Sequence, residues 1–383
     1  SLCYNPPMKK RISRVFLSLC IITLGLSIPA CRLEIPELTA LSAGLGRGIN
    51  LGNALEAPRE GDWGVVLQES FFRWIAQAGF DTVRIPIRWS AHILDDDPYT
   101  IDETFFRRVD WAIAQAFSNG LKAVINIHHF IELKEDPSPV HIGILERLWV
   151  QIAERYRAYP STLYYELLSE PGQNITPLLW NEILARIVPV IRSVDPTHTL
   201  IIGELDGTGE DTLSSLRIPP NATPVIATFH YYEPMFFTHQ GAAWTEPIYG
   251  TTGVSWPGPP QTPIIPCQAA LNDLWASWWF EAYNTLPLYE NPAGYAPIVE
   301  RLETAAKWSR ANGIPIWLGE FGSIQTADLS SRANWTGFVC RESERLNIDW
   351  AYWDFCAAFA AFDLPSESWI DLVLNALIPD KPE

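Results

Sequence analysis

Eight short apolar runs alternate with longer segments of helical periodicity, and this rhythm constrains the fold more than any other feature of the chain. The runs cover residues 48–53, 82–89, 122–129, 162–170, 199–203, 224–232, 315–321 and 348–355. Helical segments lie between them, at 68–79, 102–119, 141–158, 177–193, 297–312 and 328–346. This order predicts an α/β fold, a single-domain (β/α)8 TIM barrel within residues 32–383. The rival, a doubly wound sheet, would usually carry a glycine-rich phosphate loop after its first strand, which this sequence lacks.

Composition narrows the range of partners. The 383 residues include 27 Lys and Arg against 44 Asp and Glu, which gives a net charge of −17, and 48% of them are hydrophobic. That apolar content excludes a disordered chain. Nucleic acid would repel a polyanion, and no basic patch favours a membrane surface, so we expect a neutral partner. The 17 Trp, 13 Tyr and 17 Phe exceed the needs of a core and suit stacking on flat apolar faces.

Residues 1–31 are typical of an export segment. Met8 precedes a basic stretch, an apolar run over 15–26 follows, and small residues lead to Cys31. The run is short for a transmembrane helix. We expect an exported protein, either secreted or anchored to the membrane only through a lipid on Cys31, although Pro29 is atypical of a lipoprotein cleavage site. We expect a monomer.

A segment after the sixth run, residues 241–296, breaks the rhythm. Five prolines between 257 and 266 exclude a regular helix or strand there. A long irregular segment in a compact domain is usually functional or disordered, and its aromatic residues favour order. We expect this insertion to lengthen the cleft or to cover it in part, with Trp275, Trp278 and Trp279 packed against the barrel.

Two glutamates close opposite strands of the predicted barrel. A barrel of this kind carries its active site at the carboxyl ends of the strands. Glu170 ends the fourth strand and Glu320 the seventh, so both side chains can face one cleft. Two carboxyls across a cleft are the minimum for glycoside cleavage. A gap of roughly 5–5.5 Å means attack by carboxylate with retention, and a wider gap means inversion. The sequence leaves the gap open, and two solvated strand-end glutamates are the alternative.

Other charged and polar residues predict structure rather than chemistry. Glu166 shares a strand face with Glu170, one layer deeper, and should be a buried, paired carboxylate. His128 and His129 could suggest a metal, but successive strand residues point to opposite faces, so we expect no metal and no cofactor. Three cysteines beyond residue 31 show no zinc spacing, although one disulfide bridge stays open: Cys267, Cys340 and Cys356.

Seven segments together resemble glycoside hydrolase family 5, and most closely the endo-β-1,4-glucanases and glucanase/mannanases of its subfamily 25. The segments are GRGINLGN, VRIPIRWSAH, NIHHF, YYELLSEP, FHYYEPMFFTHQG, WLGEFG and AYWDFC. They run in order from about Gly48 to Trp369. The resemblance implies a cofactor-independent, retaining endo-β-1,4-glycanase with a β-1,4-linked polysaccharide or oligosaccharide as substrate. An endoglucanase is the first choice, and a β-mannanase or xyloglucanase on the same site is the alternative.

The resemblance also implies roles for individual residues. Glu170 would be the general acid/base, with a pKa raised by Glu320 and by burial, and Glu320 the nucleophile. Arg84 would keep the nucleophile ionised, since an opposite charge lowers a carboxyl pKa. The remaining implied positions order these groups or bind substrate: Asn53, Glu56, His128, His129, His230, Tyr232, His239, Trp244 and Trp353.

Two positions depart from the pattern of the family. Ser169 stands where the family has an Asn that holds the sugar 2-hydroxyl, and serine offers one hydroxyl instead of an amide. We expect reduced turnover or a changed balance between glucan and mannan. A carbohydrate-binding barrel of low activity is the alternative. Residues 203–211 also depart, in the fifth-strand region.

Overall fold

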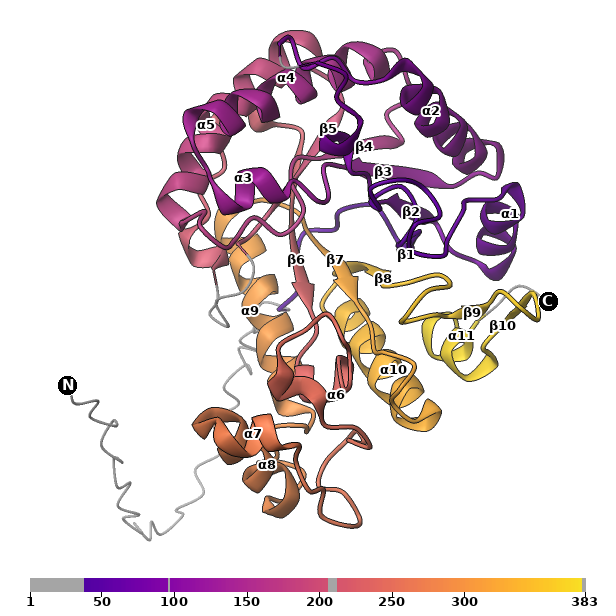
Figure 1. The fold of residues 1–383 in the computed structure, drawn as a ribbon, viewed down its shortest axis with the longest axis vertical. Helices are drawn as coiled ribbons and strands as arrows, with labels where there is room; N and C mark the ends of the chain where they lie inside the picture. The colour runs from indigo at the N-terminus through magenta and orange to yellow at the C-terminus, as the bar shows by residue number, and fades with distance from the viewer. Residues whose placement is uncertain (1–37, 96, 206–211, 381–383) are drawn as a thin grey trace, which may run out of the picture. The chain divides into compact units, whose positions relative to one another are not determined.

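Eight parallel strands close into a barrel in the computed structural model, which describes residues 38–95, 97–205 and 212–380 (Figure 1). The strands pair in chain order and β1 closes on β8. Their bounds are β1 Arg47–Asn50, β2 Thr82–Ile85, β3 Lys122–Asn126, β4 Leu163–Glu166, β5 Thr199–Gly203, β6 Val225–Tyr231, β7 Ile316–Phe321 and β8 Asp349–Tyr352. The predicted (β/α)8 barrel is confirmed. The predicted export segment and Cys31 lie outside the described residues.

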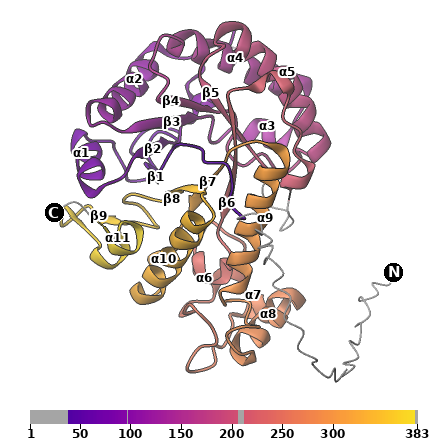
Figure 2. The same ribbon diagram turned by 180° about the vertical axis from the view of Figure 1, so that it is seen from behind.

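Helices surround the strands, as both views of the barrel show (Figures 1 and 2). The main ones are α1 Glu69–Ala78, α2 Glu103–Ser118, α4 Pro139–Tyr156, α5 Pro177–Val194, α9 Ala296–Asn312 and α10 Leu329–Arg345. Shorter ones are α3 Ile131–Glu135 and α11 Asp371–Leu377, and a two-stranded sheet joins β9 Phe362–Asp363 to β10 Ser368–Trp369. Local signals set the helix ends: the Asp102 side chain caps α2, and Gly313 ends α9 with a φ of 66°. None of the described helices is long and apolar enough to cross a membrane.

The predicted strands are too long at their carboxyl ends. The runs at 82–89, 122–129 and 162–170 were expected to stay extended, whereas β2, β3 and β4 stop three or four residues earlier. After β2 the cause is Pro86, which has no N–H for the sheet ladder. The chain then turns over the barrel mouth. Several residues expected on strands therefore lie on loops at the rim, where their side chains can converge.

The barrel interior has an apolar layer and a polar layer. Leu45, Val124, Ile201, Ile226, Trp317 and Ala351 form a buried cluster in the lower layer. Strand register sets the polar layer above it: Asn50 pairs with Arg84, and Asn126 with Glu166. A register shift between β6 and β7, at Phe229 and His230, brings His230 opposite Glu320. Bulges of this kind re-aim side chains beside active sites.

The insertion after β6 is partly helical. Helix α6 Met235–Thr238 precedes it, and it contains α7 Gln268–Asn272 and α8 Leu274–Thr285, which lie side by side at the bottom of Figure 1. The proline-rich stretch 257–266 is irregular, as predicted, but the expectation of irregular structure fails at 268–285, beyond the last of these prolines. Side-chain amides replace ladder bonds in the irregular part: Gln240, for example, bonds both backbone groups of Val254.

The insertion tryptophans pack less than expected. Trp279 is buried and contacts Phe236, which lies in α6 between β6 and the insertion. Trp275 also contacts Phe236 but is 48% exposed, and Trp278 is 59% exposed. The predicted packing of all three against the barrel is therefore wrong for Trp278, which faces solvent.

Candidate active site

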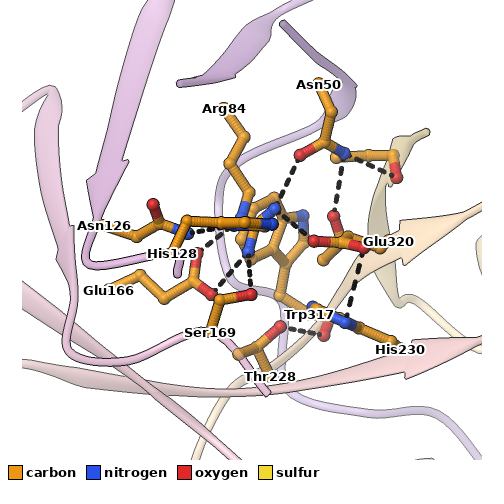
Figure 3. Close-up of polar contacts among 12 residues, drawn as sticks. Asn50, Arg84, Asn126, His128, Glu166, Ser169, Thr228, His230, Trp317 and Glu320 are labelled. Atoms are coloured by element: carbon orange, nitrogen blue, oxygen red, sulfur yellow. Dashed lines mark hydrogen bonds and ion pairs between the residues drawn. The ribbon is translucent and has the colours of Figure 1, made fainter. Parts of the chain in front are cut away.

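Arg84 organises the polar layer beneath the barrel mouth. Its guanidinium is fully buried and donates five hydrogen bonds (Figure 3). Nε and Nη2 bind Glu166 at 2.5 and 2.7 Å. Nη1 reaches Asn50 at 2.8 Å and Glu320 at 2.5 Å, and Nη2 reaches the Ser169 hydroxyl at 3.0 Å. Burial lowers the pKa of Arg84, but the two carboxylates outweigh it and raise that pKa above its usual value. Arg84 is therefore a permanent cation between two buried acids, and Glu166 is the paired carboxylate that the sequence predicts.

Glu320 receives donors on both carboxylate oxygens. Oε1 accepts from Arg84, and Oε2 accepts from the Tyr232 hydroxyl at 2.9 Å. His230 Nδ1 lies 3.6 Å from Oε2. Burial raises the pKa of Glu320, whereas the charges of His230 and Arg84 act in the opposite direction. The side chain is only 4% exposed, so these donors take the place of water around the carboxylate.

Glu170 lies just past β4 and pairs with His230. Its φ of 49° is a left-handed conformation, uncommon for a residue with a Cβ, and it aims the side chain into the barrel mouth. His230 Nδ1 bonds Oε1 at 2.8 Å. Burial lowers the pKa of His230, but Glu320 and Glu170 outweigh it and raise that pKa to about 9. Burial raises the pKa of Glu170, but the bond from His230 prevails and lowers it to about 2.

This pairing corrects the expected raised pKa of Glu170. Sequence reasoning considered Glu320 and burial, but not the histidine cation in direct contact. In the free protein the pair holds its proton on His230. Strongly interacting groups titrate as a unit, so that proton belongs to the pair and is available at Glu170 across one hydrogen bond.

The two rim glutamates are close together. One ligand atom from each of Glu170, His230 and Glu320 lies within 4.8 Å of the others. Such a group could hold a metal ion by spacing alone. A bound cation would, however, have to compete with Arg84 for Glu320 and with the hydrogen bond between His230 and Glu170. Inverting glycosidases hold their carboxyls roughly 6.5–9.5 Å apart and retaining ones roughly 5–5.5 Å apart. Carboxylate oxygens of Glu170 and Glu320 within 4.8 Å of each other favour the retaining class.

A cleft of about 680 Å³ opens above these carboxylates. Its lining includes most of the residues singled out from the sequence, namely Asn53, Glu56, His128, His129, Glu170, Tyr232, His239, Trp244, Glu320 and Trp353. Three predicted residues lie beneath the lining instead: Arg84, Ser169 and His230. Arg84 donates to Glu320 and to Ser169, and His230 bonds Glu170. The structure thus brings every predicted site residue to one place. Trp244 is 62% exposed at the cleft.

Two cleft histidines are neutral and have defined tautomers. Burial lowers the pKa of His128 well below its usual value and that of His239 to about 4. The Asn126 amide oxygen accepts from the Ile87 backbone, so its nitrogen donates to His128 Nδ1 and leaves the proton on Nε2. The Thr238 hydroxyl bonds the Tyr232 carbonyl and accepts from His239 Nδ1, which leaves His239 Nε2 as an acceptor. The cleft therefore offers uncharged donors and acceptors that suit hydroxyl groups.

His128 and His129 do not point to opposite faces, contrary to expectation. Their rings lie 4.6 Å apart and both line the cleft, because β3 ends at Asn126 and strict alternation ends with it. The argument against a shared metal ion therefore fails. Burial lowers the pKa of His129 to about 4. Both rings are therefore neutral near pH 7.

Trp353 lies in a tight cradle at the cleft. Its ring stacks on His128 with centroids 5.6 Å apart and an interplanar angle of 6°. A Cβ at Gly52 would lie 2.9 Å from the indole, and one at Gly322 would lie 1.9 Å from the Trp353 carbonyl. Only glycine allows these approaches. The ring is thereby held as a flat apolar face at the carboxylates.

Glu56 braces the loop after β1 instead of standing free in the cleft. Its carboxyl accepts the backbone N–H groups of Asn53 and Ala54, and it is 1% exposed. Burial raises its pKa to about 8, and the charge of Asp354 adds to that shift. Asp354 accepts the N–H groups of Ala357 and Phe359, and burial raises its pKa to about 6. These two acids shape the loops that carry Asn53 and Trp353.

Sequence reasoning missed several contributors. Asn50 and Asn126 orient Arg84 and His128, and Trp63 and Phe359 line the cleft. The position of the two asparagines, each the last residue of its strand, was the available signal. Trp63 lies in the segment between β1 and α1, and its ring contacts that of His129 edge-on with centroids 5.5 Å apart. No local sequence pattern predicts this contact.

A (β/α)8 barrel with two carboxylates facing each other in a cleft at its strand ends is the architecture of a glycoside hydrolase. The family model of cellulases, glycosyl hydrolase family 5, matches residues 47–359. The chain belongs to glycoside hydrolase family 5.

Named relatives agree with this placement. Endoglucanase H of Acetivibrio thermocellus is 33% identical over 310 residues, 81% of this chain and 29% of that protein. Endoglucanase 3 of Fibrobacter succinogenes is 25% identical over 338 residues, 83% of this chain and 50% of that protein. The chain thus spans half or less of the length of these two relatives.

Solved structures match over nearly their whole length. Thermotoga maritima Cel5A in complex with cellobiose shares 43% identity and covers 87% of this chain and 97% of its own, with a TM-score of 0.75. The clostridial cellulose synthase subunit Z of Clostridioides difficile shares 33% identity over 87% of this chain and 99% of its own, with a TM-score of 0.74.

Proposed function

We propose that the protein is a retaining endo-β-1,4-glucanase that hydrolyses β-1,4-glucan through a covalent glycosyl-enzyme. The observation that carries this proposal is that carboxylate oxygens of Glu170 and Glu320, which both line one cleft, lie within 4.8 Å of each other. That spacing leaves too little room for a water between a base and the sugar, and it favours direct attack by a carboxylate. The finer likeness to subfamily 25 is part of the same proposal.

The reaction runs in two displacements. Glu170 gives a proton to the glycosidic oxygen while a Glu320 oxygen bonds the anomeric carbon, and the leaving chain departs with the C–O electron pair. Glu170, now a carboxylate, takes a proton from water, whose oxygen attacks the same carbon and releases Glu320. Arg84 and Tyr232 hold Glu320 as an anion before attack. His230 supplies the Glu170 proton through their 2.8 Å hydrogen bond.

The cleft suits a neutral polysaccharide. Trp353 offers an apolar face to a sugar ring. Neutral His128 and His239 offer a donor and an acceptor to its hydroxyls. Trp63 and Trp244 come from segments after β1 and β6, strands that are not neighbours in the barrel, and can contact sugars away from the bond that breaks.

A substrate panel tests this function. The protein should release reducing sugar from carboxymethylcellulose and cut cellotetraose internally, and the first product should keep the β configuration when followed by NMR. β-Mannan and xyloglucan in the same panel rank the alternative substrates. Binding of cellotetraose with no hydrolysis would replace the enzyme with a carbohydrate-binding barrel, and an α product would replace retention with inversion.

We also propose that the protein is exported, with residues 1–31 as the export segment, and that it works as a monomer. The basic stretch, the apolar run and Cys31 support the export of the protein. Expression with residues 1–31 should place the protein outside the cytoplasm, and labelled palmitate should mark the wild type but not Cys31→Ala if the lipid anchor exists. Sedimentation of the processed protein tests the monomer.

A further inference from the structure

Ser169 is fixed on both its backbone and its side chain. It follows β4 and is 1% exposed. Its backbone N–H donates to the Ile127 carbonyl at 2.9 Å, which ties it to the loop after β3. Its hydroxyl oxygen accepts from Arg84 Nη2 at 3.0 Å. The side chain therefore lies under the cleft lining, beside the guanidinium, rather than free in the cleft as a 2-hydroxyl partner would be.

The Ser169 hydroxyl completes the partners of Arg84. A guanidinium has five N–H donors, and four of them go to Glu166, Asn50 and Glu320. The fifth goes to Ser169. Because the guanidinium is 0% exposed, water cannot replace a lost acceptor without repacking. A buried donor left unpaired is costly, so the position of this hydroxyl constrains the guanidinium.

The geometry transmits that constraint to Glu320. Guanidinium is a rigid planar fork, so the acceptors of one nitrogen fix the direction of the others. Glu166 holds Nε and one hydrogen of Nη2, and Ser169 holds the second hydrogen of Nη2. Nη1 is then directed to Glu320. Without the Ser169 hydroxyl, Glu166 alone binds Nε and Nη2, and the guanidinium can tilt toward Glu166.

We propose that Ser169 is a positioning residue, whose hydroxyl oxygen is the fifth acceptor of Arg84 and keeps the guanidinium aligned with Glu320. This inference rests on the proposed function, in which Glu320 is the nucleophile. The groups that face Glu320 are Arg84, His230, Tyr232 and Glu170. Of these, only Arg84 is bonded to Ser169.

The test is the pH profile of kcat/KM on cellotetraose for Ser169→Ala and Ser169→Cys. Alanine removes the acceptor, and cysteine nearly keeps the volume but is a weak acceptor. Both variants should lose about 10- to 100-fold in kcat/KM. Their acidic limb should move up by about 0.5–1 pH unit, because a weaker bond from Arg84 makes Glu320 easier to protonate. Ser169→Thr keeps the oxygen and should keep the wild-type limb.

Controls separate this idea from simpler ones. Ser343→Ala removes another fully buried serine, on the outer helix α10, and should leave the profile unchanged. Lost activity with an unmoved acidic limb in both the Ala and Cys variants would overturn the positioning role and indicate direct contact with the sugar. Wild-type rates in both would overturn it as well. A wild-type protein that hydrolyses no glucan would instead overturn the proposed function.

Discussion

Two pairs of buried carboxyls lie at the barrel mouth, and they are stabilised in opposite ways. Glu166 and Glu320 share the Arg84 cation. Glu56 and Asp354 accept bonds chiefly from backbone N–H groups. The charge of Arg84 opposes the rise that burial causes in the pKa of Glu320, whereas burial raises the pKa of Glu56 to about 8 and that of Asp354 to about 6.

The difference separates chemistry from support. A nucleophile must be an anion before the sugar arrives, so it needs a cation that cannot lose its proton, and arginine meets that need. A loop brace needs only acceptors of fixed direction, and a carboxyl that takes up a proton still has them. The same side-chain type therefore serves both purposes, and its surroundings decide which.

The largest expected effect comes from the reacting pair itself. Glu320→Gln should lower kcat on cellotetraose by at least ~10³-fold, because an amide cannot form the glycosyl-enzyme. Glu170→Gln should lose as much on cellotetraose but less on a dinitrophenyl cellobioside, whose leaving group needs no proton. Glu154→Gln, exposed on α4, is the matched control. Near wild-type turnover by either variant would remove these residues from the mechanism.

Replacement of Arg84 removes the cation that distinguishes the Glu166–Glu320 pair from the Glu56–Asp354 pair. Arg84→Met leaves Glu166 and Glu320 buried without their shared cation, which should destabilise the protein by about 3–5 kcal/mol and lower kcat/KM by about 100-fold or more. Denaturant unfolding and kinetics measure the two effects. Arg332→Met is the control, since buried Arg332 donates to backbone carbonyls rather than to Glu166 or Glu320, and its loss should not move the acidic limb of kcat/KM. An equal shift of the acidic limb of kcat/KM in Arg84→Met and Arg332→Met would contradict a special role for Arg84.

His230→Asn tests the shared proton. In the wild type, His230 and Glu170 should keep one proton until the pH rises through about 9, the raised pKa of His230. Without the imidazolium, Glu170 must hold the proton alone, and its carboxyl loses it at lower pH. The alkaline limb of kcat/KM should therefore move to lower pH, with a loss of about 10- to 100-fold at pH 7. An unmoved alkaline limb would show that the pair does not carry the proton.

Glu56→Gln tests the second pair through stability. Because the folded pKa of Glu56 is raised from 4.5 to about 8, the folded state binds this proton more tightly. The stabilisation is fully present below about pH 4.5 and is lost as the pH rises to about 8. The wild type should lose a few kcal/mol across that range, and the variant should lose less. Equal pH dependence in urea titrations would contradict a protonated Glu56.

Sequence reasoning went far with the fold because its signals are local. Apolar runs and helical periodicity act within a few residues, and they predicted the eight strands and six main helices. The caps at Asp102 and Gly313, which set helix ends in the structure, are equally local. The ends of β2, β3 and β4 were wrong because the barrel mouth, a tertiary feature, decides where each strand stops. Helices α7 and α8 were not predicted, because the prolines that precede them indicated irregular structure for the whole insertion.

The active-site predictions also succeeded where the signal was local and failed where it was tertiary. Residues at strand ends could be named, but their partners could not. That Ser169 bonds Arg84, and that Asp354 lies near Glu56, depends on strands far apart in sequence. The reversed pKa expectation for Glu170 has the same origin, since the decisive neighbour, His230, is 60 residues away.

The glycines around Trp353 also limit how this cleft can be changed. A methyl group at Gly322 would overlap the Trp353 backbone, and one at Gly52 would crowd its indole. A mutant library that randomises one of these positions at a time should yield mostly inactive clones. New specificity at this end of the cleft would then require simultaneous replacement of the tryptophan and its neighbours, whereas exposed Trp63 and Trp244 can be varied singly.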